Sequence, residues 1–222
     1  MKKAVVFDLD GTLTIGEFLD KEAYYRYKLR LYQSLVEFDS RLREVISSDN
    51  FLYQMRLLAR EFFREDPVKR KRVTEIVDKI IDEYGAYSQK FFKPDPAAEK
   101  VVRKLKEKSI KVAVCTYSSR KIAYKVLREL GVLKLLDVIS CRDDVEYPKP
   151  DPRHLLEVLN LLKVSPEAAL YVGDSLFDVE CARAAGVDIV VIVRDESKKN
   201  AFKNVPIVKS LSEILDVVTA DP

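Results

Sequence analysis

Five short apolar segments constrain the fold of this chain more than any other feature of its sequence. They lie at 4–7, 111–115, 137–140, 169–172 and 188–193, and their length and composition are typical of buried strands. Amphipathic stretches at 119–131, 151–163 and 175–186 separate the last four, and another at 96–108 precedes the second. Alternation of buried strands with helices predicts an α/β domain with a doubly wound parallel sheet, the Rossmann-like arrangement.

A long segment between the first two predicted strands breaks this alternation. Residues 16–93 contain no convincing strand and no glycine between Gly16 and Gly85, and they read as amphipathic helices at 17–38, 48–63 and 67–85. This segment holds 14 of the 21 Phe and Tyr residues, so it can pack a core of its own. We expect an all-helical domain at 16–93, inserted into an α/β core formed by 1–15 and 94–222, with the return hinge at 93–96.

Composition narrows the class of protein and its partners. The formal charge of +3 on 222 residues indicates neither a nucleic-acid nor a membrane partner, and no apolar run approaches the ~18 residues of a membrane span. Three widely spaced cysteines predict small buried residues rather than a disulfide scaffold. We expect a cytoplasmic protein. Its 34% of charged residues, against ~25% in typical domains, suggests a thermophilic source. The sequence does not indicate the oligomeric state.

Polar side chains follow the ends of the first four predicted strands. In chain order they are Asp8 and Asp10, then Thr116, then Lys149, then Asp174 and Asp178. Ligands of open α/β sheets bind outside the carboxyl ends of the strands, so we expect these side chains to meet there. A carboxylate beside a buried strand costs several kcal/mol unless it is paired or bound to a metal. An all-oxygen carboxylate cluster suits Mg²⁺, and together with a lysine it attracts phosphate.

Each of these residues also has a structural interpretation. Asp8 and Asp10 could cap a turn, Thr116 could be an ordinary hydroxyl at a strand end, and Lys149 could be a solvated loop lysine. Asp178 lies three residues after a predicted helix cap, so it could serve in capping alone. The combination, in this order along the chain, favours a functional site.

Four motifs together resemble the haloacid dehalogenase (HAD) superfamily. They are "DLDGTLT" at 8–14, "VAVCT" at 112–116, "KPDP" at 149–152 and "GDSLFD" at 173–178. The chain is most similar to the phosphatase branch with a helical cap after the first motif, which includes phosphoglycolate phosphatases. This resemblance implies a Mg²⁺-dependent phosphatase that hydrolyses a small phosphorylated metabolite, a phosphate monoester, through an aspartyl-phosphate.

The resemblance also implies a role for each acid and for the metal. Asp8 would attack phosphorus, and Asp10 would protonate the leaving oxygen and then deprotonate water. The carboxylates of Asp8 and Asp174, with the backbone carbonyl of Asp10, would bind Mg²⁺.

The remaining motif residues would hold the phosphoryl group. Thr116 and Lys149 would contact its oxygens, and backbone N–H groups near Leu9 and Tyr117 would add further contacts. Asp178 would orient Lys149 or a water on the metal. Tyr117 stands where many relatives have Asn, so it either contacts the substrate differently or packs against the cap.

Other functions remain open at this point. A phosphomutase of the same superfamily would keep all four motifs, whereas dehalogenases generally lack the second acid, which Asp10 supplies here. Phospho-receiver domains also gather acids, a Thr and a Lys, but they are about half this length. A binding protein on the same scaffold would lack turnover.

Three further features allow a functional and a structural interpretation. The basic run at 69–72 suggests nucleic-acid binding or, with its flanking acids, a solvated helix face. The Tyr-rich stretch at 23–32 suggests a substrate pocket or the helical domain's own core. His154, the only histidine, has no second ligand beside it and is expected to be structural or exposed.

Overall fold

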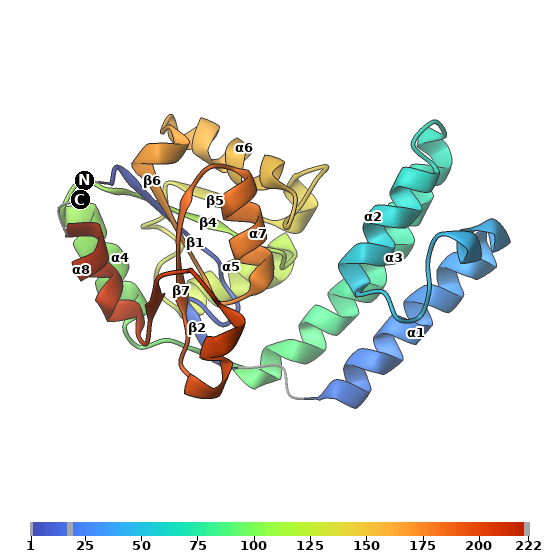
Figure 1. The fold of residues 1–222 in the computed structure, drawn as a ribbon, viewed down its shortest axis with the longest axis horizontal. Helices are drawn as coiled ribbons and strands as arrows, with labels where there is room; N and C mark the ends of the chain where they lie inside the picture. The colour runs from blue at the N-terminus through green and yellow to red at the C-terminus, as the bar shows by residue number, and fades with distance from the viewer. Residues whose placement is uncertain (1, 17–19, 220–222) are drawn as a thin grey trace. The chain divides into compact units, whose positions relative to one another are not determined.

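The computed structural model describes residues 2–16 and 20–219 and divides into two compact units. One unit comprises Met1–Glu17 and Phe92–Pro222, and the other comprises Phe18–Phe91. Figure 1 shows the first as helices around a sheet and the second as helices alone. Residues 1, 17–19 and 220–222, which fall within the expected domain ranges, lie outside the described residues.

A six-stranded parallel sheet forms the centre of the first unit. Its order is β5-β4-β1-β6-β7-β8. The strands, in that order, span Val138–Ser140, Lys111–Cys115, Ala4–Phe7, Ala169–Gly173, Asp188–Ile192 and Ile207–Val208. All five predicted segments form strands, and the predicted α/β fold is confirmed. The sequence does not predict β8, because two residues carry no periodic signal.

Helices cover both faces of this sheet (Figure 1). They are α4 (Ala98–Glu107), α5 (Arg120–Glu129), α6 (Pro152–Leu162), α7 (Leu176–Ala184) and α8 (Ile214–Thr219). Val5 and Phe7 of β1 pack into one hydrophobic cluster with α4, α5 and α8, whereas Ala4 and Val6 pack into another with α6 and α7. Because β1 is buried on both faces, it is apolar at every position and is anchored firmly behind the acids that follow it.

A short antiparallel pair of strands lies where the chain leaves the first unit and returns to it. β2 (Thr14–Gly16) pairs with β3 (Phe92–Pro94), so that Thr14 lies opposite Pro94. The expectation that 16–93 is free of strands is therefore wrong at its two borders. Each strand has only three residues, and its partner is far away in the sequence, so neither shows an alternating pattern.

Over its described residues, the second unit contains the α-helices α1 (Lys21–Phe38), α2 (Leu52–Phe62) and α3 (Pro67–Ser88). Asp20 caps α1, and the Tyr87 hydroxyl of α3 donates a hydrogen bond to the same carboxylate. α3 continues past Gly85, its expected end. A glycine inside a helix costs about 1 kcal/mol, and the contacts of Tyr87 beyond it offset this cost. The Tyr27 and Tyr84 rings also pack together, with centroids 5.6 Å apart.

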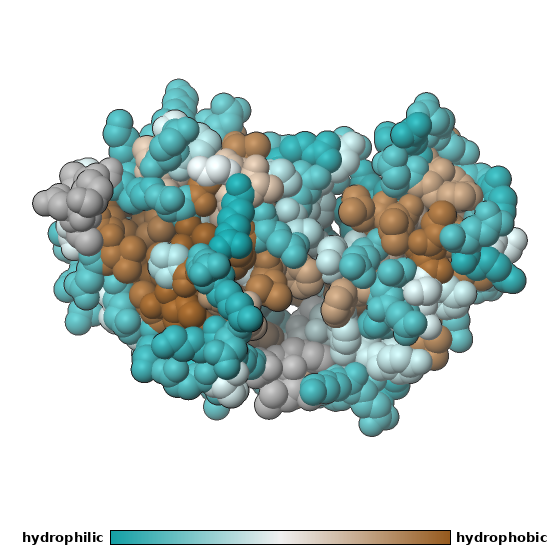
Figure 2. Space-filling view, viewed as in Figure 1, coloured by the Kyte–Doolittle hydropathy of each residue, from teal (hydrophilic) through white to brown (hydrophobic). Residues whose placement is uncertain are grey.

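The surface of the second unit is mixed in character. In the basic run at 69–72, Lys69 pairs with Asp39 at 3.2 Å and Arg72 pairs with Glu75 at 2.9 Å. Figure 2 shows hydrophobic residues gathered over α2, where Leu57 is 55% exposed.

Within residues 2–16 and 20–219, no helix is both long and apolar enough to cross a membrane. Single 3₁₀ segments complete the chain at Ser40–Glu44, Gln89–Phe91, Arg142–Asp144, Pro166–Ala168, Glu196–Ala201 and Leu211–Glu213.

Candidate active site

The predicted site residues meet at the carboxyl edge of the sheet, around the end of β1. This strand lies between β4 and β6, where the order of strands along the sheet reverses. Hydrogen bonds and close contacts between side chains arrange these residues in two groups. Asp8, Lys149, Asp174 and Asp178 form one, and Asp10 and Thr116 are joined through Ser118 in the other.

Lys149 lies at the centre of the first group. Its Nζ donates to Asp8 Oδ1, Asp178 Oδ1 and the Tyr171 hydroxyl, each at 2.7 Å, so all three N–H groups are used. The side chain is only 4% exposed. Burial opposes its charge, but Asp178 and Asp8 outweigh this effect and raise the pKa of Lys149 well above its usual value. Lys149 is therefore a fixed cation.

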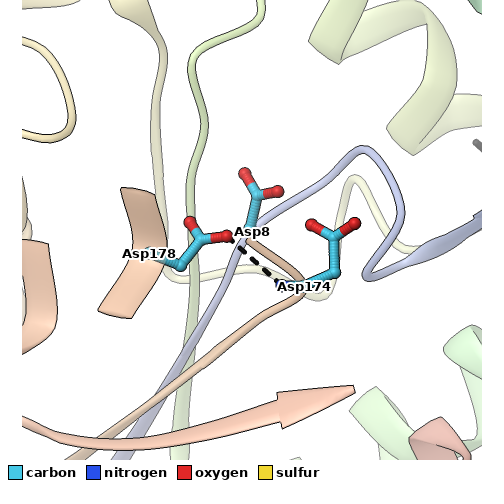
Figure 3. A group of neighbouring side chains, drawn as sticks. All are labelled: Asp8, Asp174 and Asp178. Carbon is cyan, nitrogen blue, oxygen red and sulfur yellow. Dashed lines mark hydrogen bonds between the residues drawn. The ribbon is translucent and has the colours of Figure 1, made fainter. Parts of the chain in front are cut away.

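Two carboxylates beside this cation are held in a state that favours a bound metal. Burial raises the pKa of Asp8 to about 7, with Lys149 opposing the rise and Asp178 adding to it. Burial, followed by the charges of Asp178 and Asp8, raises the pKa of Asp174 well above its usual value. One oxygen from each of Asp8, Asp174 and Asp178 lies within 4.8 Å of the others (Figure 3). A hard divalent cation such as Mg²⁺ fits this oxygen donor set and would relieve the repulsion.

Asp178 differs from the other two acids because its oxygens are already occupied. Oδ1 accepts from Lys149 and from the Tyr171 hydroxyl, at 2.7 and 3.0 Å. Oδ2 accepts from the Ser175 hydroxyl and from the backbone N–H groups of Ser175 and Asp174. Asp178 thus serves in the capping box of α7 and pairs with Lys149 at once, so its two interpretations from the sequence do not exclude each other. The carboxylates of Asp8 and Asp174 accept fewer hydrogen bonds and are more accessible to a metal.

The electrostatics of Asp178 agree with this arrangement. Burial opposes its ionisation, but Lys149 and the hydrogen bonds from Ser175 and Tyr171 together lower its pKa. Gly173 makes room for it, since a Cβ there would lie 2.4 Å from the Asp178 Cβ. The "GD" of the fourth motif therefore has a steric reason as well as a chemical one.

The loop after β1 is a tight turn around one carbonyl. The Leu9 carbonyl accepts the N–H groups of Thr12, Leu13 and Thr14, at 3.0 to 3.3 Å. Gly11 has a φ of +82°, and a Cβ there would lie 2.0 Å from Asp174 Oδ2. Only glycine fits this close approach. Among the described residues, the Leu9 N–H has no acceptor, which leaves it for a ligand.

The loop after β4 connects Thr116 to Asp10. Thr116 is 1% exposed, and its Oγ1 accepts the Ser118 N–H at 3.0 Å. Its own O–H donates to no other described residue and is available to a phosphoryl oxygen. The Ser118 hydroxyl donates to Asp10 Oδ2 at 2.5 Å. The half-buried ring of Tyr117 lies against Arg142, whose guanidinium carbon is 5.6 Å from the ring centroid.

Three residues that contact this site are not among the predicted ones. Ser118 and Tyr171 bind Asp10 and Lys149 as described, and His154 holds the backbone of Lys149. The His154 Nδ1 accepts the Lys149 N–H at 3.2 Å, and Nε2 lies 3.0 Å from the Ser140 hydroxyl. Burial, with the charge of Lys149, lowers the pKa of His154 to about 3. His154 is therefore neutral and buried. Its position five residues after Lys149, early in a predicted helix, is the only signal of this contact in the sequence.

Comparison with known proteins gives consistent relatives. Residues 2–186 match the family described as haloacid dehalogenase-like hydrolase. The chain is 31% identical to pyrophosphatase PpaX of Halalkalibacterium halodurans, over 96% of this chain and 95% of that protein. It is 26% identical to a phosphoglycolate phosphatase of Mesorhizobium japonicum, over 85% and 81% of the two chains. A crystal structure of a HAD phosphatase from Thermococcus onnurineus superposes with a TM-score of 0.61 at 25% identity, covering 100% of this chain and 99% of that one.

Proposed function

The chain belongs to the haloacid dehalogenase-like hydrolases, and we propose that it is a Mg²⁺-dependent phosphatase of a small phosphorylated metabolite. The family match confirms the resemblance that the motifs indicate. The single observation that carries the proposal is the Lys149–Asp8 pair at 2.7 Å, with the Asp174 carboxylate beside it. Relatives named as a pyrophosphatase and a phosphoglycolate phosphatase support a small phosphorylated substrate.

In the proposed first step, a carboxylate oxygen of Asp8 attacks phosphorus. The phosphorus–oxygen bond to the leaving group breaks, and Asp10 donates a proton to that oxygen. The Thr116 hydroxyl and the Leu9 N–H donate to phosphoryl oxygens, and Lys149 shares with the phosphoryl group the N–H that it donates to Asp8. The carboxylates of Asp8 and Asp174 and the Asp10 carbonyl would hold Mg²⁺, which would offset negative charge on the transferred group.

In the second step, Asp10 takes a proton from water, and the water oxygen attacks the aspartyl-phosphate. The bond between phosphorus and Asp8 breaks, which releases inorganic phosphate and restores the Asp8 carboxylate. Ser118 supports this exchange of roles, because its hydroxyl donates to Asp10 Oδ2 and so helps to hold the carboxyl group in place.

We also propose that the inserted helices act as a cap that contributes substrate specificity. The insertion follows the catalytic loop after only a few residues, and the helices carry their own aromatic contacts, such as Tyr27 with Tyr84.

A cytoplasmic location is part of the same proposal. The three cysteines are free and buried, which agrees with a reducing compartment.

The test is phosphate release from a broad panel of phosphate monoesters and pyrophosphate, with Mg²⁺ and with excess chelator. We expect turnover that requires the metal, together with a phosphorylated enzyme that can be trapped by rapid quenching. The Asp8→Asn variant is the control and should neither turn over nor become labelled. Full activity in excess chelator, or no phosphate release from any compound, would refute the proposal. Accumulation of an isomeric phosphate ester in place of inorganic phosphate would indicate a phosphomutase.

A further inference from the structure

Arg194, two residues after β7, binds the backbone of the catalytic loop although no sequence motif includes it. Its Nη1 donates to the Gly11 carbonyl at 2.5 Å, and its Nη2 donates to the Thr12 carbonyl at 3.1 Å. Gly11 and Thr12 directly follow Asp10. One guanidinium therefore spans the two peptide groups that come next after the proposed acid.

Asp95 fixes Arg194 from the other side. Its Oδ2 accepts from Arg194 Nη2 at 2.7 Å, and its Oδ1 accepts the Ala97 N–H at 2.8 Å. The Asp95 N–H donates to the Leu13 carbonyl at 3.1 Å, so Asp95 also touches the catalytic loop directly. Asp95 is 7% exposed and Arg194 24%, so water screens this pair only in part. Asp95 directly follows β3, the strand by which the chain returns from the inserted helices.

The loop between these contacts has little freedom to compensate for their loss. On one side Gly11 lies so close to Asp174 that a Cβ would overlap its carboxylate, at 2.0 Å. On the other side the carbonyls of Gly11 and Thr12 face Arg194. Without the guanidinium, the two carbonyls lose these donors, while the close approach of Gly11 to Asp174 restricts movement of the turn in that direction.

We propose that Arg194, held by Asp95, is a positioning residue that keeps the turn after Asp10 in place, so that the Asp10 carboxylate reaches the leaving oxygen. Arg194 contacts main-chain carbonyls and Asp95, and it is not required to touch the substrate. The inference rests on the proposed phosphatase function, because it assigns Arg194 an effect on leaving-group protonation.

The first measurement compares two substrates in Arg194→Ala. An alkyl phosphate needs its leaving oxygen protonated, whereas 2,4-dinitrophenyl phosphate does not. We expect kcat/KM to fall by about 10²-fold for the alkyl ester, since misplacement of a catalytic group by about 1 Å has an effect of this size. We expect little change for the dinitrophenyl ester. Millimolar guanidinium should restore part of the lost rate, and Arg194→Lys should fall between wild type and Arg194→Ala.

The matched control is Arg183→Ala. Arg183 also donates to a backbone carbonyl, that of Asn204 at 2.9 Å, but away from the site. This variant should leave kcat/KM unchanged for both esters. Equal losses on the two esters in Arg194→Ala would overturn the proposal, because a merely structural role weakens both reactions alike. Unchanged rates on both esters would overturn it too.

Hydrogen exchange provides a readout that does not depend on activity. The amides of 12–14 should exchange faster in Arg194→Ala, while those of β6 and α7 stay protected. Unchanged exchange in the loop would refute the positioning role even if the wild type showed no phosphatase activity. An inactive wild type whose loop loosens in the variant would instead refute the proposed function alone. If Arg194→Ala does not fold, Asp95→Asn provides the same comparisons, because it keeps the guanidinium and removes only its charged partner.

Discussion

Two regions of the candidate site hold their aspartates in opposite ways, although one oxygen from each of the three lies within 4.8 Å of the others. Asp178 lies in the first turn of α7, whereas Asp8 and Asp174 lie in the loops that follow β1 and β6. Asp178, in that turn, accepts hydrogen bonds on both oxygens, and these bonds with Lys149 lower its pKa. Asp8 accepts only from Lys149 among the described residues, and the Asp174 carboxylate accepts from none of them. The pKa values of both are raised.

The difference teaches that burial alone does not decide what a carboxylate contributes. Asp178 is buried and satisfied, so it stabilises the fold and fixes Lys149. Asp8 is buried and Asp174 is half-buried, and both lack enough partners, which costs stability that a bound cation and a phosphoryl group would restore. The same type of side chain therefore has a structural role at one position, and a reactive or metal-binding role is proposed for it a few ångströms away. Each prediction below tests this division.

The largest expected effect is that of Asp8→Asn on turnover. The amide is nearly isosteric and can still accept from Lys149, so the fold should remain intact, but an amide is not a nucleophile. Phosphatase activity should fall by about 10⁴-fold or more. Steady-state phosphate release, with circular dichroism to confirm folding, measures this. Substantial activity in a preparation free of wild-type enzyme would remove Asp8 from its proposed role.

Asp178→Asn and Asp174→Asn should change stability in opposite directions. Asp178→Asn removes one partner of a buried pair and leaves the Lys149 charge less compensated, a change that costs about 3–5 kcal/mol. Asp174→Asn removes a carboxylate that repels its neighbours, so the metal-free protein should become more stable. Denaturant unfolding in chelator at neutral pH compares the two variants. Destabilisation of equal size in both would erase the distinction between scaffold and ligand carboxylates.

The sequence predicts the meeting of Asp8, Lys149 and Asp174 because parallel strands end at a common edge, whatever the side-chain detail. It does not predict the contacts that tune these groups. Tyr171 lies within an apolar strand and resembles any core residue. Arg194 follows a strand end like many surface arginines. Which of such residues reaches the site depends on rotamers and on packing between distant segments, and local patterns carry no information about either.

The helical insert shows the same limit in another form. Periodicity predicts three helices, because each amphipathic run is long enough to display its apolar face. It places the end of the third at Gly85, whereas α3 runs to Ser88. The Tyr87 hydroxyl bonds to Asp20, 67 residues earlier in the chain. A contact at that separation overrides a local helix-ending signal.

The dependence of Mg²⁺ stabilisation on pH tests the unsatisfied carboxylates directly. The pKa of Asp8 is about 7 in the folded protein, against 3.8 ordinarily. Between these values the folded state binds more protons than the unfolded state, so this group's contribution to metal-free stability falls as pH rises. Asp174 acts with the same sign. Mg²⁺ needs the deprotonated carboxylates, so its stabilising effect should grow through the same range.

Thermal unfolding with and without Mg²⁺, near pH 5 and near pH 8, measures this effect. At a metal concentration about 100 times the dissociation constant at the higher pH, stabilisation should reach about 2.7 kcal/mol. It should be much smaller near pH 5, and Asp174→Asn should abolish most of it at both values. A shift of equal size at both pH values would contradict the raised pKa of Asp8 and the contrast with Asp178.

The smallest expected effect is that of Tyr171→Phe, which tests how far the fixed position of Lys149 and Asp178 depends on a single hydroxyl group. The Tyr171 hydroxyl accepts from Lys149 and lies 3.0 Å from Asp178 Oδ1. Its loss removes the hydrogen bond accepted from Lys149 and the one donated by the hydroxyl but leaves Lys149 both carboxylate partners, so we expect a destabilisation of about 1–2 kcal/mol. The KM for the substrate should change little, because Asp8 and Asp178 still hold the ammonium. Urea unfolding and steady-state kinetics measure the two quantities. A loss as large as that of Asp178→Asn would mean that the phenol, rather than the Asp178 carboxylate, fixes Lys149.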